Sequence, residues 1–487
     1  MSTISCVIRF IISAAMSVAM SIGGWLGLAW QGCATPLKDL SQLELSNGNR
    51  ILLERGVVTH AWVPADDSDS ETPPADDLAR LGYGPSYYDG RMFNLPLHTA
   101  YPEMPWGMGM APGDALGRES MPPGGEWLSP DQLRYIDTLE SVCFGDEQEY
   151  SAAEAQRLRL WFADFRDRHP GVLLHSNQWA YQWSREQYQE YLRVAQPDML
   201  TFDTYYFDER GSTPDCGIPA LVADAVNYVR IPALGGYDGS GRSPIPFGQY
   251  LLGFKPGYDS ADRRLYEITE SQKHLVANLT LAMGGKWLNN FRIIMGSDIF
   301  LFYDADGRPT RHFAEYQKIN EEVAALSPHL VKLQTTDVRV LPGRHRWYSL
   351  EWDNQLPKTV NRFDAGNAFL LKDISVKNTG NENGGLPGDV YVGYFAVLPD
   401  QSFESGKARR YFAVCNGLTS GNGKTVEEQH GSCAETTQEI TLKLKPSDEL
   451  RLYAVNAETG ATEEVTITDN RATFSLGGGN MRLLYWE

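Results

Sequence analysis

The sequence predicts an α/β fold, a (β/α)₈ barrel followed by a C-terminal antiparallel β-sandwich. From Ser129 to about Leu326, capped helices alternate with short apolar strands, as in parallel sheets covered by helices on both faces. After about Leu333 the helical pattern stops, and short segments alternate with a period of two residues. The chain has 487 residues, which is enough for one barrel and a smaller second domain.

The barrel strands are predicted from apolar runs that end in polar or aromatic residues. Three come from the N-terminal third, in the segments ILLERGVVTHAW, GPSYYDG and RMFNLPLHTA. An open doubly wound sheet is the alternative, but no GxGxxG follows any strand, as a dinucleotide-binding fold would require. The other five strands are expected near residues 141–146, 171–178, 198–206, 245–254 and 287–293.

Four predicted helices begin with a capping box. In this motif the Ser or Thr side chain accepts from the backbone amide three residues on, and the Glu or Gln side chain there accepts from the Ser or Thr amide. The helix after Ser151 also carries an apolar stripe that should pack on the sheet. Further helices are expected around 218–229 and 311–326. The four capping residues are Ser129, Ser151, Ser184 and Thr269.

The domain boundary is expected near residue 335, which gives a barrel over 40–334 and a sandwich over 335–487. Residues 1–33 are interpreted as an export signal, because Arg9 precedes a long uncharged apolar run. The segment WQGCAT then predicts lipidation and membrane attachment at Cys33, with an uncleaved anchor as the alternative. We therefore expect an exported protein at the cell surface or in the periplasm.

Charge and cysteine usage narrow the range of partners. The net charge is −19, and the sequence contains no Lys/Arg cluster that could contact a phosphate backbone. Nucleic acid is therefore not an expected partner. Cys415 and Cys433 flank a Gly/Ser-rich loop and could form a disulfide or remain free thiols. No CxxC or His-rich spacing is present, so we expect no metal and no cofactor.

Polar and aromatic residues gather at the expected C-terminal ends of the barrel strands, where barrel active sites lie. Amides and carboxylates bind hydroxyl groups, and aromatic faces stack on sugar rings, so this mixture predicts a carbohydrate ligand. For each residue named below, an ordinary structural role is the alternative. The expected sugar-binding residues are Asp146, Asn177, Gln178, Trp179, Tyr205, Tyr206, Gln249, Asn290, Arg292 and, in a Met-rich loop, Trp106.

The stretch CFGDEQEYS places Asp146, Glu147 and Glu149 directly after the fourth expected barrel strand. Repulsion among crowded carboxylates raises at least one pKa, as a general acid requires. Strand alternation predicts that Glu147 points inward and Asp146 outward. Glu147 is therefore the predicted acid, with a solvated loop as the alternative.

Three segments resemble a known group of proteins. PDMLTFDTYYF, SQKHLVANLTLAMGGKWLNNFRI and YDADGRPTRHFAEYQKINEEVAAL are similar to GH42-like, clan-A-like glycoside hydrolase barrels. The resemblance covers about residues 130–335. It implies a glycosidase whose acid/base carboxylate ends strand four, at Glu147, and a C-terminal accessory β-sandwich.

One departure concerns the second carboxylate, which that group places at the end of strand seven. IPFGQYLLGFK contains no Asp or Glu, so Asp203 on strand six is the predicted substitute, as nucleophile or as base. Strands four and six are not neighbours. The two carboxyls are therefore expected nearer the ~6.5–9.5 Å of inverting enzymes than the ~5 Å of retaining ones. The alternative function is a non-catalytic glycan-binding barrel.

Overall fold

The computed structural model describes most of the chain from Leu40 to Glu487. Many of the undescribed segments follow barrel strands, so the loops around one end of the barrel are largely outside the description. The predicted export signal and Cys33 also lie outside it. The structure describes residues 40–64, 71–87, 92–109, 126–207, 217–256, 266–296, 299–347, 349–366, 368–403, 405–421, 431–447 and 449–487.

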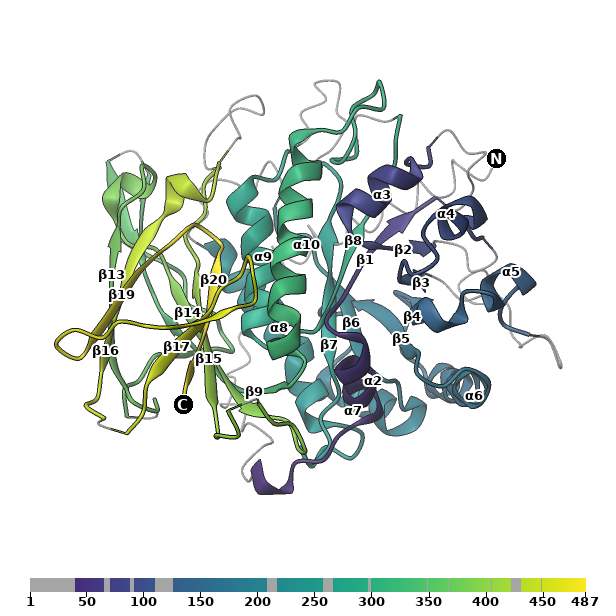
Figure 1. Cartoon of the computed structure of the whole chain (residues 1–487), viewed down its shortest axis with the longest axis horizontal. Coiled ribbons are helices and arrows are strands. Elements are labelled where there is room, and N and C mark those ends of the chain that lie inside the picture. Colours follow the sequence, from purple (N-terminus) through teal and green to yellow (C-terminus); the bar gives the residue numbers. More distant parts are fainter. Residues whose placement is uncertain are drawn as a thin grey trace. The chain divides into compact units, whose positions relative to one another are not determined.

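Eight parallel strands close into a barrel in chain order, and antiparallel sheets follow, which confirms the predicted fold class (Figure 1). Each strand pairs with the next, and β8 pairs with β1. The strands are β1 (Val58–Val63), β2 (Gly84–Tyr87), β3 (Trp106–Met108), β4 (Leu139–Asp146), β5 (Leu173–Trp179), β6 (Leu200–Asp203), β7 (Phe247–Leu252) and β8 (Trp287–Phe291).

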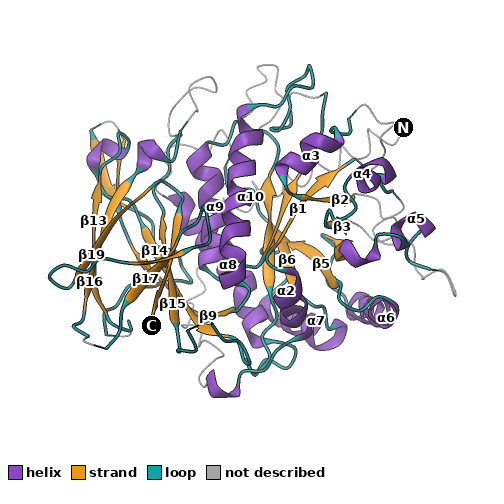
Figure 2. Ribbon diagram, viewed as in Figure 1, coloured by secondary structure: helices purple, strands orange, loops and turns teal. Residues whose placement is uncertain are grey.

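The helices cover the outside of the barrel strands (Figure 2). Ser129, Ser184 and Thr269 form complete capping boxes, whereas Ser151 only accepts from the Glu154 amide. The helices are α2 (Asn47–Arg55), α3 (Ala75–Leu81), α4 (Leu95–Ala100), α5 (Pro130–Leu133), α6 (Ala152–Arg168), α7 (Arg185–Ala195), α8 (Ile218–Gly235), α9 (Glu270–Ala282) and α10 (Arg311–Leu330).

The first and third strand predictions were wrong in part. In ILLERGVVTHAW only the second half forms β1, because Ser46 caps α2 and holds ILLER in a helix. RMFNLPLHTA contains α4 rather than a strand, since the Asn94 side chain accepts from the Leu97 amide at 2.9 Å. The third strand is β3, inside the segment that was expected to be a Met-rich loop.

Large side chains fill the inside of the barrel. Trp62 of β1 meets Tyr250 of β7 at a ring-centroid distance of 5.7 Å, and Tyr250 meets Trp287 of β8 at 5.1 Å. Leu52 of α2 belongs to the same buried cluster. Since β1 and β7 are not paired, their contact lies in the interior, and these residues show which side of each strand faces inward.

The C-terminal region contains a seven-stranded, a three-stranded and a two-stranded sheet. The order is β12-β9-β14-β15-β20-β17-β18 in the first, β13-β16-β19 in the second and β10-β11 in the third. The strands are β9 (Leu333–Leu341), β10 (Arg344–Trp347), β11 (Leu350–Asp353), β12 (Asn361–Arg362), β13 (Leu371–Asn378), β14 (Val390–Val397), β15 (Arg410–Asn416), β16 (Gln438–Leu444), β17 (Leu452–Val455), β18 (Thr462–Glu464), β19 (Arg471–Leu476) and β20 (Met481–Trp486).

The central strands of the seven-stranded sheet are buried on both faces, whereas its edge strands β12 and β18 are exposed. Phe412 and Val414 of β15 pack in one core with β13 and β16, whereas Tyr411 and Cys415 belong to the core that includes α9. Helix α9 contacts the barrel strand β7 and also β14, β15 and β20. Barrel and sheets accordingly fall in one compact unit, Thr35–Glu487, and the domain boundary at 335 stays a prediction.

The cysteines of the sheet region are free. Cys415 and Cys433 are both buried thiols, so the alternative without a disulfide is the correct one. Within the part of the chain that the structure describes, no helix combines the length and apolar character needed to cross a membrane.

We predict that Gly393→Ala destabilises the whole unit. A Cβ at Gly393 of β14 would lie 1.7 Å from the Ala282 carbonyl oxygen at the end of α9, so backbone must move. Overpacking of this kind costs about 1–3 kcal/mol. Thermal unfolding followed by circular dichroism should show one transition at lower temperature. Gly366→Ala is the control, because its nearest contact is the Asp364 side chain, and two separate transitions would contradict the shared unit.

Candidate functional site

The candidate site lies at the C-terminal ends of β4, β5 and β6, where three strands end next to one another. A bulge in β4 shifts the register, so that Asp146 rather than Gly145 lies beside Asn177 of β5. The expectation that Asp146 points outward was therefore wrong. The bulge adds one residue, and one residue is enough to reverse the faces of a strand.

Asn177 connects two carboxylates. Its Nδ2 donates to Asp146 Oδ1 at 2.9 Å and to Asp203 Oδ1 at 3.1 Å. Asn177 is almost completely buried, whereas Asp146, Glu147 and Asp203 each keep part of their surface exposed. One amide group therefore fixes the positions of acids from β4 and β6.

Glu147 and Asp203, the two predicted catalytic carboxyls, share a hydrogen bond. The expected gap of ~6.5–9.5 Å is thus absent, because the turn after β4 carries Glu147 toward β6. A hydrogen bond between two carboxyl groups requires one proton between them. The site holds three acids, of which two act as a pair.

The turn that carries Glu147 is held from several sides. Glu147 has a φ of 52°, a left-handed conformation that costs a residue other than Gly some free energy. Its amide donates to the Asn177 carbonyl at 2.9 Å. Gln182 donates to the Glu147 carbonyl at 2.6 Å, and the Trp183 indole donates to the Gln148 carbonyl at 2.9 Å. These bonds keep Glu147 in a conformation that it would otherwise avoid.

Burial raises the pKa of Asp203 above its usual 3.8, while hydrogen bonds with Asn177 and Glu147 act in the opposite direction. The bond with Glu147 favours the ionised form of Asp203, and the two carboxyls share one proton. This arrangement provides one protonated and one ionised carboxyl in contact, the combination that acid-assisted bond cleavage needs.

Two further predicted residues, Trp179 and Tyr205, lie close to these acids. Trp179, beside Asp203 in the strand register, is partly exposed. Tyr205 is close enough to Asp203, Glu147 and Asp146 for their charges to raise its pKa, although burial is the larger cause. Arg292 follows β8 and lies over the Phe300 ring at 5.2 Å.

Other predicted residues point away from the barrel interior. Gln178 donates to Ser176, and Tyr206 donates to Gln249 at 3.0 Å. Gln249 in turn donates to Thr280 of α9. Asn290 pairs in register with Ala61 and Leu251, on the outer side of the barrel. These four side chains therefore face the helices.

Trp106 was wrongly predicted as a sugar platform. Its side chain is 0% exposed, and its indole donates to the Tyr135 carbonyl at 2.9 Å. The ring packs against Tyr87, Phe93 and His98. No face is open to a ligand, because Trp106 belongs to β3 and not to a loop.

Sequence reasoning missed two inward residues, Tyr250 of β7 and Asn289 of β8. Tyr250 pairs in register with Asn289, and neither the Tyr250 hydroxyl nor the Asn289 amide has a hydrogen-bond partner among the described residues. Burial raises the pKa of Tyr250 well above 10, and the negative charges of Cys143, Asp146 and Asp203 act in the same direction. The phenol therefore stays protonated and can donate a hydrogen bond. Alternation from Trp287 along WLNNF would have selected Asn289 over Asn290.

A narrow cavity lies behind the tyrosines, between β6, β7 and α9. Its volume is about 10 Å³, the space of roughly one water molecule, and Tyr205, Tyr250 and the buried Lys273 contribute to its wall. It is too small for a sugar. A substrate must approach the partly exposed carboxyls from the strand ends.

No model of a known protein family matches the chain, and no curated protein matches it significantly. Solved structures give weak likenesses. A glucosidase from Croceicoccus marinus is 9% identical over 88% of this chain and 96% of its own, with a TM-score of 0.38. A putative α-L-fucosidase from Bacteroides thetaiotaomicron is 12% identical over 57% and 98%, with a TM-score of 0.33. At such values these likenesses carry no argument about activity.

We predict that Asp203→Asn stabilises the fold at neutral pH. Because the folded-state pKa of Asp203 is raised, its contribution to stability is full below about pH 3.8 and is lost as the pH rises through the folded value. The amide avoids the burial of a charge. Melting temperatures measured from pH 4 to 8 should show a gain over wild type that grows with pH. Asp353→Asn, at an 88% exposed side chain, should show none, and an equal gain at every pH would contradict the assignment.

Proposed function

We propose that the protein is a glycoside hydrolase that uses Glu147 and Asp203. The observation that carries this proposal is the hydrogen-bonded carboxyl pair, partly exposed at the C-terminal ends of the barrel strands. Glycosidic cleavage needs one carboxyl that protonates the leaving oxygen and one ionised carboxyl that acts as nucleophile or activates water. A pair that shares one proton contains both forms.

Each acid has a separate role in the proposal. Glu147 holds the proton and donates it to the leaving oxygen, and Asp203 provides the negative charge that attacks the anomeric carbon or activates water. Asn177 fixes Asp203 and Asp146 through its two hydrogen bonds. The pair must separate when a sugar enters between the two carboxyls, because their contact leaves no room for an anomeric carbon.

The surroundings favour a neutral, hydroxyl-rich ligand. Trp179 and Tyr205 offer aromatic surface beside the acids, and Tyr250 and Asn289 offer polar groups that have no partner among the described residues. Buried polar groups of this kind need water or a ligand. Carbohydrate satisfies both features. Export and lipidation at Cys33 remain part of the proposal and would place the enzyme where extracellular glycans are present.

A non-catalytic glycan-binding protein is the second candidate. Strand β7, FGQYLL, carries no carboxyl, and the Glu147–Asp203 contact is closer than either separation known for glycosidases. Such a protein would bind a glycan without releasing sugar. Activity and binding must therefore be measured together.

We predict that Glu147→Gln and Asp203→Asn each lower kcat/KM at least ~10³-fold, because each removes an essential proton donor or anion. The full-length chain is incubated with aryl glycosides and with plant, algal and microbial polysaccharides, and released reducing sugar is measured. Glu149→Gln is the matched control, since Glu149 is exposed in the same loop, and it should retain activity.

The same panel separates the two candidates. Loss of activity in both variants, with unchanged circular dichroism, supports the hydrolase. Glycan binding that is equal in wild type and both variants, with no sugar released by any of them, supports the binding protein and overturns the catalytic roles.

A further inference from the structure

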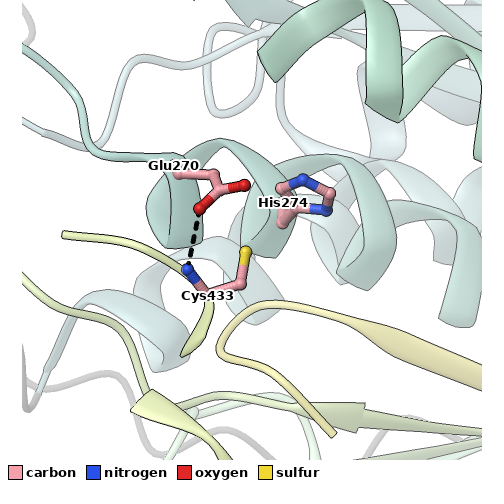
Figure 3. Close-up of side chains that lie close together, drawn as sticks. All are labelled: Glu270, His274 and Cys433. Atoms are coloured by element: carbon pink, nitrogen blue, oxygen red, sulfur yellow. Dashed lines mark hydrogen bonds between the residues drawn. The ribbon is translucent and has the colours of Figure 1, made fainter. Parts of the chain in front are cut away.

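Three potential metal ligands meet where α9 faces the loop before β16. Glu270 and His274 lie one helical turn apart on α9, and Cys433 approaches them from the loop (Figure 3). Their ligand atoms all lie within 4.8 Å of one another. Among the described residues this is the only group of at least three His, Cys, Asp or Glu side chains with such spacing.

His274 is the observation that points to a ligand. Its side chain is 0% exposed, yet neither ring nitrogen has a hydrogen-bond partner among the described residues. The nearest carboxylate oxygen, Oε2 of Glu322 on α10, is 3.5 Å from Nδ1 without forming a hydrogen bond. A buried imidazole with two unpaired nitrogens is costly unless something else binds it.

The loop is already positioned for such a role. The Cys433 amide donates to Glu270 Oε2 at 3.0 Å, which holds the thiol next to the helix. Cys433 is a free, buried thiol. Ser271 donates its amide to the Gly431 carbonyl at 3.2 Å, so two residues of α9 fix the loop backbone at Gly431 and at Cys433.

We propose that Glu270, His274 and Cys433 bind one zinc ion that joins α9 to the sheet region. Thiolate, imidazole and carboxylate are all zinc ligands, with Zn–S near 2.3 Å and Zn–N or Zn–O near 2.0–2.2 Å. Tetrahedral ligands at those lengths are roughly 3.5 Å apart, so side-chain shifts of about 1 Å close the site. Glu322 lies beside His274, where metal-bound histidines commonly have a neighbouring carboxylate.

The site is separate from the carboxyl pair, and the zinc is structural. Its ligands come from α9 and from a loop of the sheet region, and none comes from a barrel strand. The proposal does not depend on glycosidase activity. The sequence allowed a disulfide at Cys433. In this proposal, zinc rather than a disulfide links the Cys433 loop to the rest of the protein.

The test is metal binding by the full-length chain. After treatment with chelator, the protein is titrated with Zn²⁺, and bound metal is measured by mass spectrometry. We expect one Zn²⁺ per chain and a rise in melting temperature, because zinc binds only the folded state. Co²⁺ in place of zinc should give the near-ultraviolet absorption of a cobalt–thiolate bond.

Variants locate the metal. Cys433→Ala should remove the cobalt–thiolate absorption and weaken Zn²⁺ binding at least ~100-fold, and Glu270→Gln should weaken it at least ~10-fold while keeping an acceptor for the Cys433 amide. Cys415→Ala is the matched control, because this buried thiol donates to the Gly479 carbonyl and is not one of the three clustered ligands, and it should bind as wild type does. Absence of stoichiometric Zn²⁺, or unchanged binding by both ligand variants, would overturn the proposal.

Discussion

Much of this structure depends on α9, a helix that is buried on nearly every side. All residues from Ser271 to Ala282 are buried, although the helix lies on the outside of a barrel. One side packs on β7 and another on the seven-stranded sheet, where Gly393 permits backbone contact with Ala282. A helix that serves two cores couples them, because neither can lose it without exposing apolar surface.

Helix α9 carries buried polar side chains on both of its packed sides. Its side toward the barrel carries Thr280, which binds Gln249, and Lys273, whose amine contacts Glu315 and His312. Its side toward the sheets carries His274, beside Cys433. Burial lowers the pKa of Lys273 to about 8, with Glu315 acting against that effect. Polar groups inside a helix of this kind need specific partners, and His274 still lacks one within the described protein.

At the strand ends, local strain and buried acids occur together. Glu147 keeps a positive φ because Asn177, Gln182 and the shared hydrogen bond with Asp203 hold it. Burial raises the pKa of Asp203, which makes its charge costly to the fold. Such costs are typical of functional sites, where geometry is maintained at the expense of stability.

The sequence by itself determined the barrel and the later antiparallel sheets, since apolar periodicity and helix caps act over a few residues. It placed Glu147 and Asp203 at strand ends but predicted a wide gap between them, and their contact came from the tertiary structure. Only the tertiary structure decided which residues face inward, because the bulge in β4 and the short β3 depend on neighbouring strands. Trp106 of β3 was misplaced for that reason. Cys433 and Glu270 are 163 residues apart, so no local spacing could reveal their contact. Contacts between distant segments are fixed by packing, which a single sequence does not display.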